Sequence, residues 1–64
     1  MKTRHFEDTD TLLIELKPGI VAEARDLDEN ALLDLDAQGQ VLAITLEHAT
    51  ARAELSFSFD RVAA

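Results

Sequence analysis

The chain has 64 residues, with 13 acidic side chains against six Lys and Arg, and a formal net charge of −7. That sign argues against binding to nucleic acid or to an anionic membrane surface, and it suits a basic protein partner or a cation. Cysteine is absent, which excludes a disulfide, and two histidines alone cannot form a structural zinc site. We therefore expect one small domain over residues 1–64, without a cofactor, that gains buried area by associating with a second copy.

The chain shows no sign of a membrane span or a secretion signal. No run of residues approaches the roughly 20 apolar positions that a spanning helix needs. The basic start of the chain, Met1 to His5, is not followed by the apolar stretch of a signal peptide. We therefore expect a cytoplasmic protein that does not contact the membrane.

Turn residues divide the chain into short runs that are typical of strands. Polar turns are expected at residues 7–10, 17–19, 28–29 and 38–39, where Pro18 presets its own φ and the glycines allow a positive one. The strands predicted between them are Thr11 to Leu16, Ile20 to Leu27, Asn30 to Asp36 and Gln40 to Glu47, with a further short strand at Lys2 to Phe6. The sequence therefore predicts an α+β, mainly β fold, namely an antiparallel meander of four to five strands.

The turns also predict a register, because residues that oppose each other in an antiparallel pair share a face. Each turn predicts one set of pairs: Leu16 with Ile20, Ile14 with Ala22 and Leu12 with Ala24; Ala24 with Leu33 and Ala22 with Leu35; Leu35 with Leu42, Leu33 with Ile44 and Ala31 with Leu46. All of these pairs lie on one wholly apolar face. Asp28-Glu29 is a poor pair for a turn that needs φ > 0 twice, so a longer loop or a bulge is the alternative there.

The C-terminal part of the chain carries two different patterns. Residues 48–53 are rich in alanine, which favours a short helical turn. Residues 54–60 alternate strictly between polar and apolar side chains, which favours a strand, although a continuous helix is the alternative. This C-terminal segment, residues 53–64, is expected either to cover the apolar face or to meet a second chain.

The predicted register gathers carboxylates on the opposite face of the sheet. It sets Glu23 directly across from Asp34, with Glu15 and Asp36 as diagonal neighbours. Like charges directly opposed are unfavourable by some tenths of a kcal/mol. Solvent screening or a bulge would relieve this repulsion, and so would a basic partner or a cation bound to the four residues Glu15, Glu23, Asp34 and Asp36. We take these four as the candidate binding residues.

No motif in the sequence predicts catalysis or a metal site. The fragment Asp34-x-Asp36-x-x-Gly39 resembles part of a calcium loop but lacks the later ligands and the distal Glu of an EF-hand. His5 and His48 have no nucleophile at a diagnostic spacing. We therefore expect a protein that is not an enzyme. The competing hypothesis is a cation-binding protein or metal-dependent enzyme that uses the four acidic residues.

Several stretches together resemble a known family. They are Phe6 to Ile14, Val21 to Glu23, and the run from Ala31 through Asp34, Asp36, Gly39, Val41 and Ile44 to Ala49. This pattern is similar to the small prokaryotic family catalogued as domain of unknown function 2283, over about residues 4 to 52. The resemblance implies a compact β-rich domain. Because some members occur beside small toxin-like genes, it also implies an antitoxin-type partner role. We therefore expect a protein-interaction module with an acidic face, antitoxin-like in its particular form.

Overall fold

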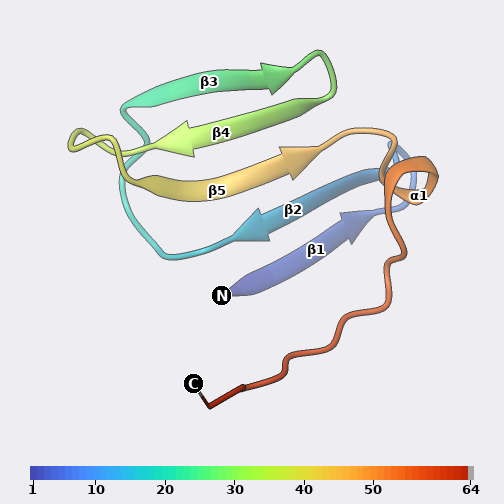
Figure 1. Cartoon of the computed structure of the whole chain (residues 1–64). Coiled ribbons are helices and arrows are strands. Elements are labelled where there is room, and N and C mark those ends of the chain that lie inside the picture. Colours follow the sequence, from blue (N-terminus) through green and yellow to red (C-terminus); the bar gives the residue numbers. More distant parts are fainter. Residues whose placement is uncertain (64) are drawn as a thin grey trace.

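Five antiparallel strands form one open sheet, and one short helix follows the last strand (Figure 1). The computed structural model describes residues 1–63. The elements in chain order are β1 (Lys2–Phe6), β2 (Thr11–Glu15), β3 (Glu23–Asp28), β4 (Ala31–Leu35), β5 (Val41–Leu46) and α1 (Ala49–Arg52). The strands lie in the order β1-β2-β5-β4-β3. The predicted antiparallel, mainly β fold with a short helical element after the strands is confirmed.

The place of β2 in the sheet differs from the predicted meander. β2 pairs with β1 and β5, with Leu12 opposite Leu46 and Ile14 opposite Ile44. The expected pairs of Leu16, Ile14 and Leu12 with Ile20, Ala22 and Ala24 were therefore wrong. The physical reason lies in β2 itself, because its central residues are apolar on both faces and an interior strand can cover both. Residues 16–22 instead form a connection to the far edge of the sheet.

β3 lies at that far edge, and its register differs from the prediction by one residue. Arg25 opposes Leu33 and Glu23 opposes Leu35, where Ala24 and Ala22 were expected. The register shifts between Asp26 and Asp28, which leaves one extra residue on β3. The expected irregularity at the second hairpin is thus confirmed. It turns β3 over, so Ala24 opposes Asp34 and does not join the apolar face as predicted.

The β4–β5 hairpin matches the prediction over most of its length. Leu33 opposes Ile44 and Ala31 opposes Leu46, as the two-residue turn predicted. Near the turn the register shifts, so Leu35 opposes Val41 rather than Leu42. The turn backbone closes when Gly39 N–H donates to the Asp36 carbonyl over 3.0 Å, and the Asp36 carboxylate accepts from the N–H groups of residues 38 and 40. Asp36 therefore stabilises the turn and lies outside any strand.

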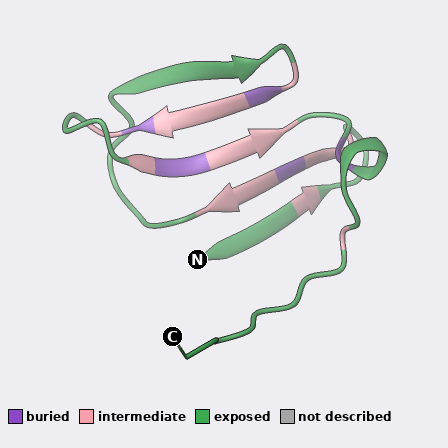
Figure 2. Ribbon diagram, viewed as in Figure 1, coloured by how far each residue is buried: buried purple, intermediate pink, exposed green. Residues whose placement is uncertain are grey.

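One face of the sheet carries the aliphatic side chains of the three central strands. We call it the aliphatic face; it consists of Leu12 and Ile14 of β2, Ala31, Leu33 and Leu35 of β4, and Ile44 and Leu46 of β5. Leu12, Ala31 and Leu35 are buried. The row across its middle, Ile14, Ile44 and Leu33, is only half-buried, as is Leu46 (Figure 2). The centre of the core is therefore less covered than its ends.

The helix α1 is attached to the end of the sheet through Asp10, which lies between β1 and β2. The Thr50 hydroxyl donates to the Asp10 carboxylate over 2.6 Å, and the Ala49 N–H donates to the Asp10 carbonyl over 2.9 Å. The Nε2 of His5 lies 2.7 Å from the same carboxylate. The hydrogen bond from Thr50 and then the one from His5 hold the pKa of Asp10 below its ordinary value. The ionised form of Asp10 thus holds α1 against the β1–β2 turn.

After α1 the described chain continues without helix or strand to residue 63. The strand expected at residues 54–60 is therefore wrong. This C-terminal tail, residues 54–63, runs away from α1 past the β1 edge (Figure 1). Leu55 is half-buried, but Phe57 is 59% and Phe59 75% exposed. Alternation indicates only which side chains would share a side of an extended segment. A strand also needs a partner strand, and this segment is not paired with β1.

The described chain is thin and exposes a large surface for its mass. Its extents are 36 × 32 × 18 Å, and its radius of gyration is 12.9 Å, against about 11 Å for a compact chain of this length. Its accessible surface is 5066 Å², where a compact monomer of 7.1 kDa exposes about 4,100 Å². The excess, about 1,000 Å², comes from a one-layer sheet with an exposed tail.

Gly39 takes a φ of +80°, and a Cβ at this position would meet no heavy atom within 4 Å. Gly39→Ala should therefore cost only backbone strain, about 1–2 kcal/mol of the free energy of unfolding. The measurement is urea denaturation followed by circular dichroism. Gln38→Ala in the same turn is the matched control and should change the midpoint little, because the Gln38 hydrogen bond to Asp36 uses the backbone N–H. Equal midpoints for the two variants would contradict the argument.

Asp10 should make the stability of the chain fall in acid. Because its pKa is lowered from the ordinary 3.8 by folding, its contribution is complete above that value and is lost as the pH falls through the folded-state pKa. Asp10→Asn keeps a residue that tolerates φ of 52° but removes the charge. We expect a lower melting temperature at neutral pH and a shallower decline below about pH 4. The exposed Glu7→Gln variant should retain the steep decline.

Candidate functional site

Two of the four predicted binding residues lie on the same face, one on each side of β5. Glu15 of β2 and Asp34 of β4 both oppose Ala43, which is buried between them. Strands lie about 4.8 Å apart, so the backbones of these two residues are separated by about 10 Å. Lys2 of β1 opposes Glu15 from the other side. We call this side of the sheet the mixed face, because basic and acidic residues share it.

The other two predicted binding residues lie elsewhere. Glu23 opposes Leu35 rather than Asp34, so the predicted confrontation of these two carboxylates was wrong. Glu23 lies on the aliphatic face and accepts hydrogen bonds from the Arg25 guanidinium, at 3.1 to 3.3 Å. Asp36 is engaged by the backbone of its own turn. The structure therefore does not gather Glu15, Glu23, Asp34 and Asp36 into one cluster.

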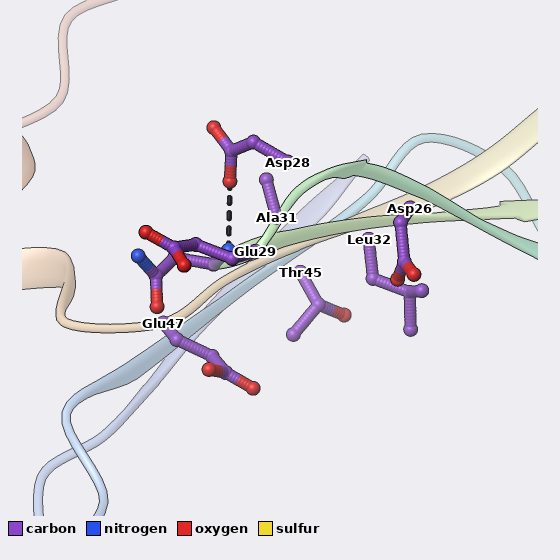
Figure 3. A pocket seen from close by; sticks show the side chains of 8 residues that line it. Asp26, Asp28, Glu29, Ala31, Leu32, Thr45 and Glu47 are labelled. Atoms are coloured by element: carbon purple, nitrogen blue, oxygen red, sulfur yellow. Dashed lines mark hydrogen bonds between the residues drawn. The ribbon is translucent and has the colours of Figure 1, made fainter.

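A different set of carboxylates lines a shallow hollow at the β3–β4 hairpin (Figure 3). We call it the acidic hollow; it is lined by Asp26, Asp28, Glu29, Asn30, Ala31, Leu32, Thr45 and Glu47. Asp26, Leu32 and Thr45 share one row of the mixed face, since Asp26 opposes Leu32 and Leu32 opposes Thr45. In Figure 3 the side chains of these three residues and Glu47 hang on the same side of the strands. The hollow is thus built from β3, β4, β5 and the turn between β3 and β4.

Backbone and side-chain hydrogen bonds fix the shape of the acidic hollow. The Asp28 carboxylate accepts from the Asn30 N–H over 2.7 Å, and the Glu47 N–H donates to the Asn30 carbonyl over 2.8 Å. Arg52 of α1 donates to that carbonyl over 3.0 Å and to the Asp28 carboxylate over 3.2 Å. Arg52 therefore ties α1 to the rim and offsets the charge of Asp28.

Most of the acidic charge is not offset by an ion pair within residues 1–63. Ion pairs there involve Asp10, Glu23 and Asp28, three of the 13 acidic residues. In the acidic hollow, Asp26, Glu29 and Glu47 are exposed side chains. Their charges project a negative potential into solvent around this corner of the sheet. A basic group is the chemistry that this potential attracts.

The described residues hold no arrangement that points to a bound metal. Within residues 1–63, no three or more His, Asp or Glu side chains lie where they could hold an ion together. Nor does any described helix have the length and apolarity to cross a membrane. The two histidines have different surroundings: His5 contacts Asp10, while His48, with φ of 55°, immediately precedes α1.

The acidic hollow was missed because the sequence argument relied on the wrong β3 register. With Glu23 set against Asp34, the predicted cluster of carboxylates fell in the middle of the sheet. The signal for the hollow was nevertheless present in Asp26-x-Asp28-Glu29, three acidic residues beside one hairpin turn. The correctly predicted pairing of Ala31 with Leu46 already set Glu47 beside that turn.

Among known proteins, one family model matches the chain. The family model described as Protein of unknown function (DUF2283) matches residues 2–49, which is most of the chain. No curated protein and no solved structure matches it. The match includes β1 to β5 and the first residue of α1, and it confirms the resemblance inferred from the strand and turn pattern. The chain belongs to the family of proteins of unknown function DUF2283.

Proposed function

We propose that this chain is a protein-interaction module without catalytic activity of its own. The observation that carries the proposal is the single-layer sheet, whose aliphatic face stays half-exposed along Ile14, Ile44 and Leu33. Domains bury a sheet face against a second layer. Residues 1–63 supply no such layer beyond the four-residue α1 at one end. A surface of this kind is stabilised by contact with protein.

The acidic hollow gives the module a preference for a basic partner. Its residues Asp26, Leu32 and Thr45 lie on the mixed face, so contact with them leaves most of the aliphatic face free. Complementary charge raises association rates and excludes partners of like charge. Leu32 and Thr45 supply the half-buried floor of the hollow, while the exposed carboxylates of Asp26, Glu29 and Glu47 surround it. This combination suits a Lys or Arg side chain whose aliphatic stem packs on the floor.

The particular form of this function that we propose is antitoxin-like. One observation supports it, the excess of acidic charge, which can mask a basic surface. The resemblance described under Sequence analysis implies the same role. In this form the partner is a small basic protein encoded beside this chain. The complex would hold the partner inactive by covering its basic surface, with no chemical step.

Charge reversal in the acidic hollow tests the proposed partner site. The chain carrying Asp26→Lys or Glu47→Lys should capture the basic product of the adjacent gene about tenfold more weakly on co-expression. Both residues are exposed, so the fold should persist. The reason for the loss is that each change removes one attractive charge and adds a repulsive one. Titration calorimetry at two salt concentrations gives the affinity, which should fall as salt rises.

The matched control is Glu7→Lys, which makes the same change of charge in the exposed β1–β2 turn. It should leave capture within about twofold, because exposed charges beyond a Debye length of about 10 Å are screened. Equal losses in all three variants would show that net charge, and not the hollow, governs binding. Failure of the wild-type chain to capture its neighbour would contradict the antitoxin-like form.

A further inference from the structure

The strongest feature left unexplained by a basic partner is the aliphatic face itself. The row across its middle runs from Thr3 through Ile14, Ile44 and Leu33 to Arg25. No acidic residue lies in this row. Two acidic residues of β3 share this face, and both are paired: Glu23, opposite Leu35, with Arg25, and Asp28, opposite Ala31, with Arg52. This face is therefore close to neutral in a chain whose net charge is −7, and it offers a basic partner no complementary charge.

A near-neutral apolar face suits a second copy of the same chain. Two copies that meet there bury aliphatic side chains and keep their unpaired carboxylates, such as those of the acidic hollow, on outer surfaces. The like-charge repulsion between the copies is then weakened by distance and by salt. A basic partner would find no complementary charge on this face.

The exposed area of the chain matches what such contact needs. The chain exposes about 1,000 Å² more than a compact monomer of its mass. A stable interface buries about 800 Å² on each partner. An interface of that size would remove most of the excess surface of each chain.

The C-terminal tail supplies the aromatic part of this contact. Its apolar residues Leu55, Phe57 and Phe59 alternate with serines, so they would share one side if the tail became fully extended. Phe59 is 75% and Val62 86% exposed in the single chain. Residues 54–62 can span about 30 Å when extended, more than the roughly 19 Å across five strands.

The attachment of α1 fixes where the tail begins. Thr50 bonds to Asp10, and Arg52 to Asp28 and Asn30, so the helix is fixed across the end of the sheet. From there the tail departs on the β1 side and leaves its own aliphatic face half-exposed (Figures 1 and 2). Its aromatic residues Phe57 and Phe59 thus stay exposed.

We propose that a second copy of this chain covers the aliphatic face, and that each copy lays residues 54–62 on the sheet of the other. The inference rests on the proposed function as an interaction module and names the occupant of one of its two faces. The basic partner is assigned to the acidic hollow on the opposite face. Apart from Ala31, which lines the hollow and also belongs to the aliphatic face, the two contacts use different residues.

The first test compares two neighbouring leucines of β4 by sedimentation equilibrium. Leu33 lies on the aliphatic face and Leu32 on the mixed face, and both are half-buried. The wild-type chain should be a dimer. Leu33→Asp should weaken dimerisation at least about 30-fold, and Leu32→Asp much less. A monomeric wild-type chain, or equal effects of the two substitutions, would overturn the proposal.

The second test leaves the sheet unchanged. Because the chain has no cysteine, Ser58→Cys offers a single site for a spin label on the polar side of the tail. This labelled chain is mixed with wild-type chain that is isotope-labelled at its methyl groups. Broadening of the Ile14, Leu33 and Ile44 methyl signals in the copy without the spin label supports the exchange of tails. No broadening of these signals overturns it, and so does broadening that is seen only when the methyl labels are placed on the spin-labelled chain instead.

The two proposals fail in different ways. A monomeric chain that still captures the basic neighbour through the acidic hollow would overturn the dimer and leave the proposed function intact. Salt separates them as well, since dimerisation through a near-neutral face should change little with salt while capture at the hollow weakens. Phe57→Ser combined with Phe59→Ser should weaken the dimer about tenfold without altering capture by the hollow. Unchanged dimerisation in that double variant would contradict the role of the tail.

Discussion

The pairing of β2 with β5 is the contact on which the rest of the sheet depends. The chain builds two local units, the β1–β2 hairpin and the β3–β4–β5 meander, and this pairing is the strand contact that joins them within residues 1–63. It brings Ile14 beside Ile44 and Leu12 beside Leu46, which continues the aliphatic face across both units. Strands about thirty residues apart pay a loop-closure cost before any contact is made. Apolar residues on both faces of β2 offset that cost.

The connection between the two units is held by the same strands. Leu16 donates its backbone N–H to the Leu42 carbonyl over 2.7 Å, and Ala22 donates to the Leu35 carbonyl over 2.8 Å. Gly19 lies so close to the Leu42 side chain that a Cβ there would come within 2.8 Å of it. The Lys-Pro-Gly stretch therefore acts as a close-fitting crossing between distant strands. Local sequence signals do not distinguish this crossing from a hairpin turn, because Pro-Gly suits both.

Contacts between residues close in the sequence were predicted better than contacts between distant ones. The β4–β5 pairing is local and its turn contains a glycine with φ of +80°, so Leu33 and Ile44 were matched correctly. The β3–β4 register failed by one residue, because a bulge costs little locally and changes every face beyond it. The neighbours of β2 were wrong because local turn signals do not fix long-range pairing. The charge of β3 was a usable sign of an edge strand.

The candidate site was predicted less well than the fold for a related reason. A cluster across strands depends on the register of every strand that contributes to it, so the single extra residue in β3 separates Glu23 from Asp34. The acidic residues of the hollow come from one hairpin and from the residue after β5, so local sequence signals were enough to find them. Asp36 illustrates the opposite case, since a carboxylate beside a glycine turn bonds to its own backbone.

The same alternation that builds the sheet separates its two surfaces. In β4, Leu33 faces the aliphatic side while Leu32 and Asp34 face the other, and the bulge in β3 sends Asp26 to that second side as well. The exposed acidic charge of the hollow therefore lies away from the half-buried residues of the aliphatic face. Contact through the aliphatic face would double the number of acidic hollows in an assembly without bringing them together. In that arrangement, the copies associate through one face of the sheet and a basic partner binds mainly at the other. Each contact can therefore form without displacing the other.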